Sequence, residues 1–472
     1  MNLMEILEKA HEMLGAHPLC DQCLGRQFAL LGYGLDDRQR GETLKLLLTM
    51  KNHQLALSGK KAGFSNLRLL AANGSSDMAA EILKNLRKKA RKKKECYLCQ
   101  GLFKSVDTLV ENALKVLENY EYSTFLVGIE LPTTVEERED EFKARFEVAY
   151  GESMRNEFSR DIGKKLVAAT EKPAEYKKPD VVVLVRPFTG EIILQSNPLY
   201  VRATYKKLVR GIPQSTWLCR SCGGRGCPKC DNTGKQYSES VEEIIAGPIM
   251  EKTVGESVSF HAAGREDVDA RMLGTGRPFV MEIKKPRKRF LDLKSLTELV
   301  NKQANEKVEI SSLRAATKDD VRRLKRGEGA QKMYKVFIDF DRNVSDEELD
   351  NVAKTLTKAS IRQQTPLRVL HRRADLVREK YIYEVKVKKV SLKRAEMQIR
   401  CQGGLYVKEL VSGDEGRTTP SVSELVDNRA KPLKLDVLRT YIDSTTLNGL
   451  AYRLKYRTGC DIINYIGGFH GR

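Results

Sequence analysis

The amino-acid sequence predicts an α+β protein with more than one domain. At 472 residues, the chain is longer than a single hydrophobic core usually supports, so two or three domains are expected. The first half alternates helical and strand patterns as an α/β unit does, whereas the second half is richer in strand patterns. Because glycine- and cysteine-rich sequence begins soon after Leu194, we predict domains over residues 1–195 and 196–472.

Helices and strands alternate in the predicted amino-terminal domain. Apolar residues recur at helical spacing from Leu3 to Leu14 and from Val106 to Leu117, which predicts two amphipathic helices. The apolar runs Phe125–Ile129 and Val181–Val185 predict strands, with a long charged helix between them. Glu191–Leu194 is expected to pair with the second strand as a hairpin, because a glycine-containing turn separates the two.

Strand patterns dominate the predicted carboxy-terminal domain. The segments Tyr334–Phe340, Tyr381–Val390 and Glu396–Cys401 have the composition of β-strands. A helix is expected over Asp346–Lys358, with Ser345 as its N-cap.

Charge is the strongest compositional signal. Lysine and arginine number 83 against 63 acidic residues, a formal charge of +20 that favours a polyanionic partner, by default a nucleic acid. The basic runs Arg87–Lys94 and Lys284–Arg289 fit contacts with an RNA backbone, although a solvated helix face explains either run almost as well. No apolar run approaches the ~20 residues of a membrane span, and the sequence begins without a signal-peptide pattern. We therefore expect a cytoplasmic protein with no membrane partner.

Two CxxC pairs lie about seventy residues apart in the amino-terminal half. A two-residue gap lets both thiolates of a pair bind one metal ion, so the two pairs together predict a tetrahedral zinc clasp that joins distant segments. Buried or redox-active thiols are the alternative. His17 could compete as a ligand but is more simply a surface residue. The predicted ligands are Cys20, Cys23, Cys96 and Cys99.

A second cysteine cluster is more compact. Four cysteines fall within twelve residues, separated by glycines that allow sharp turns, which predicts a Cys₄ knuckle around a structural zinc ion. Cys401 and Cys460 stand alone and are expected to be core thiols. The predicted knuckle ligands are Cys219, Cys222, Cys227 and Cys230.

The segment Gly264-Arg265-Glu266-Asp267 has the composition of a glycine-flanked turn. Arg265 lies two residues before Asp267, so the two could form a salt bridge that keeps the carboxylate ionised. An ionised and positioned carboxylate can serve as a nucleophile or a base.

This segment resembles the GR-x-D motif in which pseudouridine synthases carry their catalytic aspartate. The longer stretch GREDVDARMLGTGRPF is similar to the archaeal and eukaryotic synthases that modify the T-arm of tRNA. Further segments match the same family in the same order, so the resemblance covers nearly the whole chain. They are CDQCLGRQF at 20–28, the block 202–217, residues 365–373, and the pair 404–410 and 416–421.

The resemblance implies a fold and a set of roles. It implies a synthase catalytic domain with a mixed antiparallel sheet, behind an accessory domain that contains a THUMP fold and the zinc clasp. Asp267 would attack a flipped uridine, with Asp269 as the competing candidate. Val407 and Leu435 or Leu438 would form an apolar wall. The expected substrate-binding residues are Tyr334 and Tyr406, which could stack on the base, together with Lys408, Arg265 and Arg202.

The implied partner is the T-arm of tRNA, with modification at position 54, position 55 or both. No cofactor is expected for catalysis, and zinc is expected to be structural. The chain is expected to act as a monomer. Two rival functions are a non-catalytic zinc-containing tRNA-binding protein or tRNA chaperone, and a zinc-ribbon DNA-binding factor. The second would leave the stretch around Asp267 unexplained.

Overall fold

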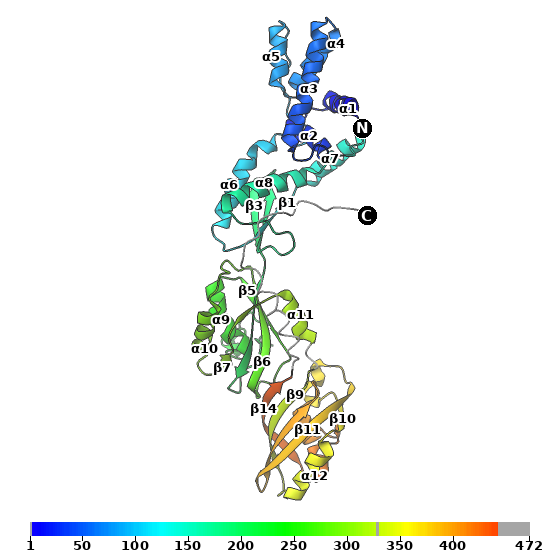
Figure 1. Cartoon of the computed structure of the whole chain (residues 1–472). Coiled ribbons are helices and arrows are strands. Elements are labelled where there is room, and N and C mark those ends of the chain that lie inside the picture. Colours follow the sequence, from blue (N-terminus) through cyan, green and yellow to red (C-terminus); the bar gives the residue numbers. More distant parts are fainter. Residues whose placement is uncertain (1, 327–329, 442–472) are drawn as a thin grey trace, which may run out of the picture. The chain divides into compact units, whose positions relative to one another are not determined.

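The computed structural model describes residues 2–326 and 330–441, which fall into two compact units (Figure 1). One unit ends at Asn197 and the other begins at Pro198. Each unit encloses apolar clusters of its own. In the described part of the chain, no helix is both long and apolar enough to cross a membrane.

The first unit begins with helices. A capping box starts the first of them, because the Asn2 side chain accepts a hydrogen bond from the Glu5 amide and Glu5 bonds back to Asn2. Helix α3 is the longest of this part, with 21 residues, and α4 and α5 pack against it and against each other. These helices are α1 (Leu3–Ala16), α2 (Asp21–Gly25), α3 (Asp37–Leu57), α4 (Lys61–Ala72), α5 (Asp77–Asn85) and α6 (Val106–Leu117).

The basic run Arg87–Lys94 does not continue a helix, contrary to its helix-compatible spacing. Helix α5 ends at Asn85, Arg87 has a left-handed backbone with φ of 54°, and residues 88–95 are neither helix nor strand. Successive lysines and arginines would place like charges at i and i+4 along a helix, which is destabilising.

A three-stranded sheet completes the first unit. Strands β1 (Phe125–Ile129) and β2 (Val181–Arg186) pair in parallel, and β3 (Glu191–Ser196) pairs antiparallel with β2, with Val183 opposite Leu194. The predicted strands and hairpin are therefore confirmed. Helices α6 and α8 (Met154–Thr170) contact this sheet.

The predicted long charged helix between β1 and β2 is two helices, α7 (Thr133–Arg145) and α8. The chain leaves the helical path between them because its backbone bonds to an earlier turn. The Glu152 amide donates to the Arg26 carbonyl over 3.2 Å, and the Leu30 amide donates to the Tyr150 carbonyl over 2.9 Å.

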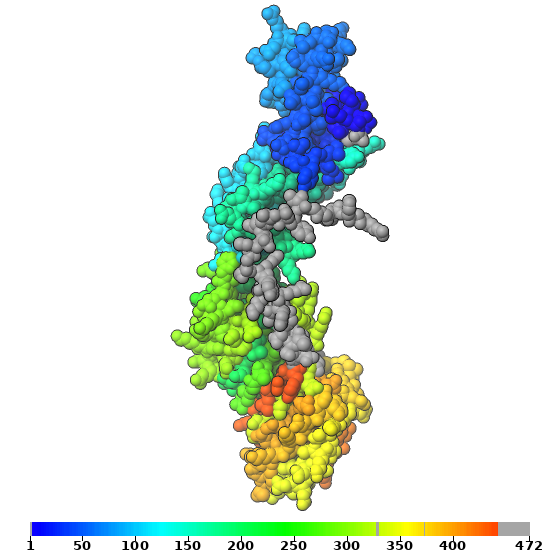
Figure 2. Space-filling model, viewed as in Figure 1, coloured from blue at the N-terminus to red at the C-terminus, as the bar shows by residue number. Residues whose placement is uncertain are grey.

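An eleven-stranded sheet forms the framework of the second unit, in the order β13-β10-β11-β12-β9-β14-β6-β4-β7, with β5 on β6 and β8 on β4. Among the described strands of this sheet, only β14 and β6 pair in parallel, so the sheet is mixed but mainly antiparallel. Figures 1 and 2 show β14, in red, where the green and orange parts of this unit meet. The strands are β4 (Leu199–Lys207), β5 (Ser257–Ala262), β6 (Arg271–Lys284), β7 (Val308–Ile310), β8 (Arg314–Ala316), β9 (Lys332–Phe340), β10 (Ser360–Gln364), β11 (Val377–Ser391), β12 (Arg394–Cys401), β13 (Thr418–Thr419) and β14 (Ala430–Thr440).

Helices cover both parts of this sheet. The predicted strands of this half are confirmed as β9, β11 and β12, although β11 is longer at each end than expected. The predicted helix is α12, whose Ser345 forms a capping box with Glu348 and which ends at Leu356 rather than Lys358. The helices are α9 (Val241–Thr253), α10 (Leu293–Gln303), α11 (Lys318–Arg326), α12 (Asp346–Leu356), α13 (Val407–Ser412) and α14 (Val422–Val426).

Candidate active site

The loop that contains Asp267 runs from the end of β5 to the start of β6 and is anchored by a buried neighbour. Glu266 accepts hydrogen bonds from Arg277 over 2.9 Å and from the Tyr205 hydroxyl over 2.8 Å. All three side chains are buried, so the anchor lies away from solvent. Gly264 has φ of +85°, and a Cβ there would lie 2.8 Å from the Lys332 Nζ atom. The left-handed backbone favours glycine, and a Cβ at this position would require the Lys332 side chain to shift.

Lys207 holds the backbone of the same loop through hydrogen bonds to its carbonyl oxygens. Its buried ammonium donates to the carbonyl oxygens of Ile212, Asp267 and Val268 over 2.9, 3.0 and 3.2 Å. Burial lowers the pKa of Lys207 to about 8, although nearby carboxylates act in the opposite direction.

Two further side chains hold the loop ends. Arg210 donates to the carbonyl oxygens of Asp269 and Leu435, 2.7 Å each, and so ties the loop to β14. The Gln214 amide donates to the Gly264 carbonyl over 2.9 Å. Sequence reasoning matched the block 202–217 but gave these residues no role. The sequence did contain a signal for them, because several polar and charged residues lie at the end of β4 and just after it.

The Asp267 carboxylate contacts two cations from distant segments. Arg368 Nη2 and Lys408 Nζ each lie 3.3 Å from Asp267 Oδ2. Arg368 is itself oriented by an ion pair with the buried Glu409. The Asp267 side chain is 34% exposed, so it is both charge-paired and open to an incoming group. Arg265, the partner expected from sequence, has its guanidinium carbon 5.0 Å from the ring centroid of Trp217.

Asp269 occupies a different environment. Lys408 Nζ lies 2.7 Å from both Asp269 oxygens. Burial would raise the pKa of this carboxyl, but the hydrogen bond and charge of Lys408 outweigh it and the pKa is lowered. The side chain is 68% exposed, and Asp269 does not line the cavity described next.

A cavity of about 300 Å³ adjoins Asp267. Its walls combine aromatic and apolar side chains, and burial raises the pKa of the Tyr334 hydroxyl, which therefore stays protonated at neutral pH. The Arg368 guanidinium lies 5.7 Å from the ring centroid of Tyr406. Of the two leucines considered for the apolar wall, Leu435 lines the cavity. The aromatic and apolar lining residues are Ala270, Tyr334, Leu405, Tyr406, Val407, Leu435 and Val437.

Arg202 is not brought to this cavity. It forms an ion pair with Asp320 over 3.5 Å and lines a separate cavity of about 310 Å³, together with Arg314 and Leu324. Its register explains the difference: Arg202 lies opposite Val280 on β6 and opposite Arg314 on β8, away from the loop that carries Asp267. Asp267, Tyr334, Tyr406, Lys408 and Arg265 all line the first cavity.

The first cysteine tetrad joins distant segments of the first unit. The four sulfur atoms of Cys20, Cys23, Cys96 and Cys99 lie within 4.8 Å of one another. A tetrahedral zinc ion with Zn–S bonds of ~2.3 Å requires S···S separations of roughly 3.8 Å, and Cys20 and Cys99 are 3.6 Å apart. The arrangement fits one zinc ion.

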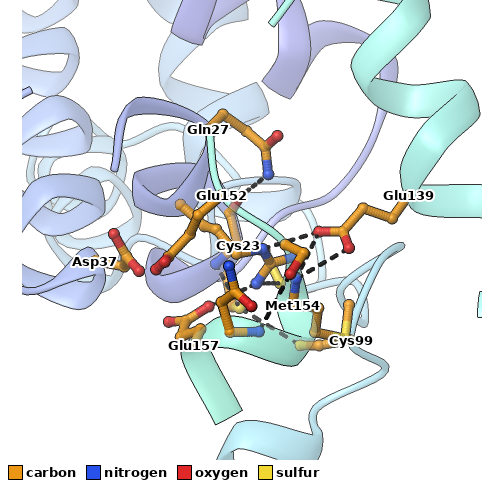
Figure 3. Close-up of polar contacts among 12 residues, drawn as sticks. Cys23, Gln27, Asp37, Cys99, Glu139, Glu152, Met154 and Glu157 are labelled. Carbon is orange, nitrogen blue, oxygen red and sulfur yellow. Dashed lines mark hydrogen bonds and ion pairs between the residues drawn. The ribbon is translucent and has the colours of Figure 1, made fainter. Parts of the chain in front are cut away.

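A buried charge network lies beside this tetrad (Figure 3). Arg26 donates to the Cys23 sulfur over 3.5 Å and forms ion pairs with Glu139 and Glu157 over 3.0 and 2.7 Å. All three charged side chains are buried. The carboxylates belong to α7 and α8, so Arg26 links the tetrad to both helices. His17, expected at the surface, is half-buried and stacks on Tyr97 at 4.0 Å.

The second tetrad is local. The sulfur atoms of Cys227 and Cys230 are 3.6 Å apart, and those of Cys219 and Cys227 are 3.9 Å apart, which again fits one zinc ion. The fourth ligand is Cys222, and all four sulfurs lie within 4.8 Å. Trp217 stands just before this knuckle and carries Arg265 of the Asp267 loop over its ring. Cys401 is buried as predicted, and Cys460 lies outside the described residues.

Comparisons with known proteins show the family of this chain. The family described as "Pus10, C-terminal" matches residues 200–441, and "Pus10 THUMP domain, archaeal" matches residues 109–186. The tRNA pseudouridine synthase Pus10 of Methanothrix thermoacetophila is 38% identical, over 92% of this chain and 94% of the relative. That of Methanocaldococcus jannaschii is 41% identical, over 93% and 95%.

Among solved structures, a Cbf5-Nop10-Gar1 complex is similar over 42% of this chain and 45% of that chain, with 15% identity and a TM-score of 0.28. The two relatives match over almost their full length, and the range matched by the carboxy-terminal family model includes the second cysteine tetrad and the Asp267 loop. The resemblance inferred from motifs is thereby confirmed: the chain belongs to the Pus10 family of tRNA pseudouridine synthases.

Proposed function

We propose that this protein converts uridine to pseudouridine in tRNA, with Asp267 as the nucleophile. The observation that carries the proposal is the contact of one carboxylate with two cations at the wall of an aromatic cavity. The two cations hold the carboxylate at the cavity wall, and a cavity of this volume can receive a single base that has left its stack.

The reaction rearranges bonds without changing composition. Asp267 attacks the target nucleotide at the ribose or at the base, and the bond between N1 and C1′ breaks. The base rotates, a bond forms between C5 and C1′, and the bond between the Asp267 oxygen and the nucleotide breaks, which returns the free carboxylate. The proton on C5 is released, and N1 gains a proton. Electrons and atoms balance, so this chemistry requires no catalytic cofactor.

Asp267 is preferred to Asp269 for two reasons. Asp267 faces the cavity, whereas both oxygens of Asp269 are engaged by Lys408 and its side chain is largely exposed. Lys408 contacts both carboxylates, which suits a residue that orients the nucleophile. We assign it that positioning role.

The aromatic residues are proposed to hold the base. Tyr334 and Tyr406 both line the cavity, and stacking on a tyrosine face is a common way to hold a splayed base. Arg265 is proposed to contact the RNA at the cavity mouth. Arg202 is proposed to bind tRNA only at a distance from the reacting base, because it lines the other cavity.

The test compares two single variants on unmodified tRNA transcripts. We expect Asp267→Ala to form no pseudouridine while its affinity for tRNA stays within a few-fold of the wild type. Asp269→Ala is the matched control, since it removes a neighbouring carboxylate and should retain activity. Pseudouridine is mapped by chemical adduct formation and primer extension. Substantial activity in Asp267→Ala would refute the assignment, and a wild type that binds tRNA but forms no product would favour the non-catalytic alternative.

We further propose that the modified positions are 54, 55 or both in the T-arm. The same mapping identifies the positions directly, because each pseudouridine stops primer extension at a defined nucleotide. The residues 1–195 are proposed to form a THUMP-containing tRNA-binding domain, with residues 196–472 as the catalytic domain. The exposed run Arg87–Lys94 supports RNA backbone contact, and neutralising it should reduce the salt dependence of tRNA affinity.

Both tetrads are proposed to hold structural zinc. Their sulfur spacing suits tetrahedral coordination, and none of the eight cysteines lines the Asp267 cavity. Metal analysis of the purified chain is expected to give two zinc equivalents, falling to one in Cys99→Ser and in Cys227→Ser. A cytoplasmic monomer is also proposed, and equilibrium sedimentation without RNA tests the oligomeric state.

A further inference from the structure

The cavity beside Asp267 has many more basic than acidic side chains. Eight lysines and arginines line it against two carboxylates, Glu266 and Asp267. Arg277 neutralises Glu266, and Arg368 and Lys408 contact Asp267. The anchoring of the loop and of the nucleophile therefore leaves several cations of the cavity without a role.

Three of these cations come from one stretch of the chain, at Arg373, Arg378 and Lys380. Arg378 and Lys380 are two residues apart on β11, so their side chains leave the same face of the strand. In the described part of the chain, neither has a carboxylate within ion-pair distance. Arg373 is exposed, and Arg378 and Lys380 are partly exposed, so their charges lie at the cavity wall without a carboxylate partner among the described residues and remain open to a ligand.

Arg378 and Lys380 each use only some of their N–H groups in hydrogen bonds to the protein. Lys380 Nζ donates to the Gly403 carbonyl over 3.1 Å. Arg378 Nη1 donates to Thr365 Oγ1 over 3.0 Å. An ammonium has three N–H donors and a guanidinium has five. Both groups are therefore oriented and still able to donate to a ligand in the cavity.

The stretch that supplies these cations is fixed to the rest of the unit. Arg417 donates to the Thr365 carbonyl over 2.9 and 3.1 Å and pairs with Asp375. Thr365 Oγ1 donates to the Ala374 carbonyl over 2.8 Å. On the other side, Gly404 has φ of +92°, and a Cβ there would lie 3.2 Å from Lys380 Nζ. The cations are thus positioned without RNA.

We infer that Arg373, Arg378 and Lys380 form a subsite for the RNA phosphates that flank the target nucleotide. This inference rests on the proposed function. Cα atoms two residues apart on a strand are separated by roughly 7 Å, which is comparable with the separation of neighbouring phosphates along an extended RNA strand. A flipped nucleotide that enters an aromatic slot leaves its phosphates at the mouth, where cations without carboxylate partners can receive them.

The first test measures binding and kinetics of the full chain with tRNA transcripts. Lys380→Ala and Arg378→Ala are each expected to raise the Kd for tRNA and the KM by roughly tenfold or more, as the loss of a charge-assisted hydrogen bond predicts. The slope of log Kd against log salt concentration should fall by about one per variant. Lys388→Ala is the matched control, because Lys388 is an exposed lysine of the same strand outside the cavity.

The second test removes the charge from the ligand instead. Synthetic RNA is prepared with a single neutral methylphosphonate beside the target uridine, on its 5′ or its 3′ side. If a cation contacts that phosphate, the methylphosphonate should weaken binding to the wild type by a similar factor and should weaken Lys380→Ala or Arg378→Ala much less. Lys380→Arg, which keeps the charge, should retain most of the wild-type sensitivity.

The outcomes separate this inference from the proposed function. The methylphosphonate and the alanine substitution each weaken binding. If the two losses of binding free energy simply add at both linkages, the phosphate subsite is overturned, even if the wild type makes pseudouridine. Wild-type affinity and salt slope in both alanine variants would overturn it too. A wild type that forms no pseudouridine would refute the proposed function, while the binding comparison would still decide whether these cations hold RNA phosphates.

Discussion

Each unit contains a buried cation beside its functional residues, Arg26 in the first and Lys207 in the second, and the two are compensated differently. Arg26, beside the first tetrad, meets two buried carboxylates from neighbouring helices. Lys207, beneath Asp267, meets only backbone carbonyls among the described residues. At the first cation, opposite charges form an ion-pair network that keeps Arg26 charged. Burial, only partly offset by nearby carboxylates, gives the second cation a pKa of about 8, so its charge can change within the range of ordinary buffers.

The largest effect is expected from Arg26→Met. This change leaves Glu139 and Glu157 buried without their shared cation, and breaking a buried pair in this way costs about 3–5 kcal/mol. Unfolding of the first unit in urea, detected by pulse proteolysis, measures the loss of stability. Arg26→Lys keeps a charge but not the forked geometry and should lose less. A cost below about 1 kcal/mol for Arg26→Met would mean that the network is not what holds the tetrad to the helices.

Lys207→Met should affect catalysis more than stability. Three carbonyls lose their donor, but a buried charge is removed at the same time, and the two effects on stability partly offset each other. The carbonyl of Asp267 is one of the three, so the nucleophile should shift, with a fall in kcat/KM on the order of 10²-fold. Lys206→Met is the matched control, since the neighbouring Lys206 pairs with Glu309 at the surface rather than with the Asp267 loop. Equal kcat/KM in both variants would contradict the positioning role.

The two cations should also differ in their response to pH. The folded pKa of Lys207, about 8, is below its ordinary value of 10.5, so between these values the unfolded chain binds one more proton than the folded chain. The penalty for burying the charge is fully present below pH 8 and is relieved as pH rises toward 10.5. The unfolding free energy of the wild type, relative to Lys207→Met, should therefore rise by about 1 kcal/mol from pH 7 to pH 9.

Pulse proteolysis in urea at the two pH values measures this difference for the second unit. Subtracting the Lys207→Met data cancels the titration of other groups that the variant leaves unchanged. Arg26 stays protonated over this range, so we expect it to contribute no pH-dependent change in the unfolding free energy. A difference that falls with pH would show that Lys207 is stabilised, not penalised, in its charged form.

The smallest effect is expected from Arg186→Met. Like Arg26, Arg186 pairs with two carboxylates, Glu130 at 2.9 Å and Glu191 at 2.7 Å. Its side chain is 37% exposed, so water already solvates the charges and the loss of stability should be much smaller than for Arg26→Met. The same unfolding assay applies. A cost close to that of Arg26→Met would show that the number of partners, rather than burial, determines the energy.

Local patterns in the sequence predicted the strands β1 to β3, β9, β11 and β12 and the helices α1, α6 and α12, but not α3 to α5. The buried face of α3 includes Lys45, Thr49 and Asn52, so its apolar periodicity is weak and gives no helical signal. Apolar runs such as Phe125–Ile129 and Val181–Val185 carry their own signal, because each is buried on alternate residues. A pattern in one segment reveals an element only when that segment buries apolar side chains.

The candidate site also contains residues that a local motif predicted and residues that only the fold brings together. The motif around Asp267 pointed to the carboxylate, and that role stays a prediction until it is tested. The cations that contact it, Arg368 and Lys408, lie about one hundred residues or more away in sequence. Only Lys408 was singled out beforehand. Arg368 and the buried Glu266 were missed, because a contact made by the fold leaves no spacing in the sequence to recognise.

Trp217 is the single tryptophan of the chain. It lies between the second tetrad and the Asp267 loop, with Arg265 over its ring and Tyr237 at its edge. Its emission therefore comes from one known place, a few ångströms from the candidate nucleophile's loop. Arrival of unlabelled RNA should quench or shift that emission when Arg265 turns toward a phosphate. Stopped-flow mixing could then time the docking step separately from chemistry, with no dye and no engineered reporter.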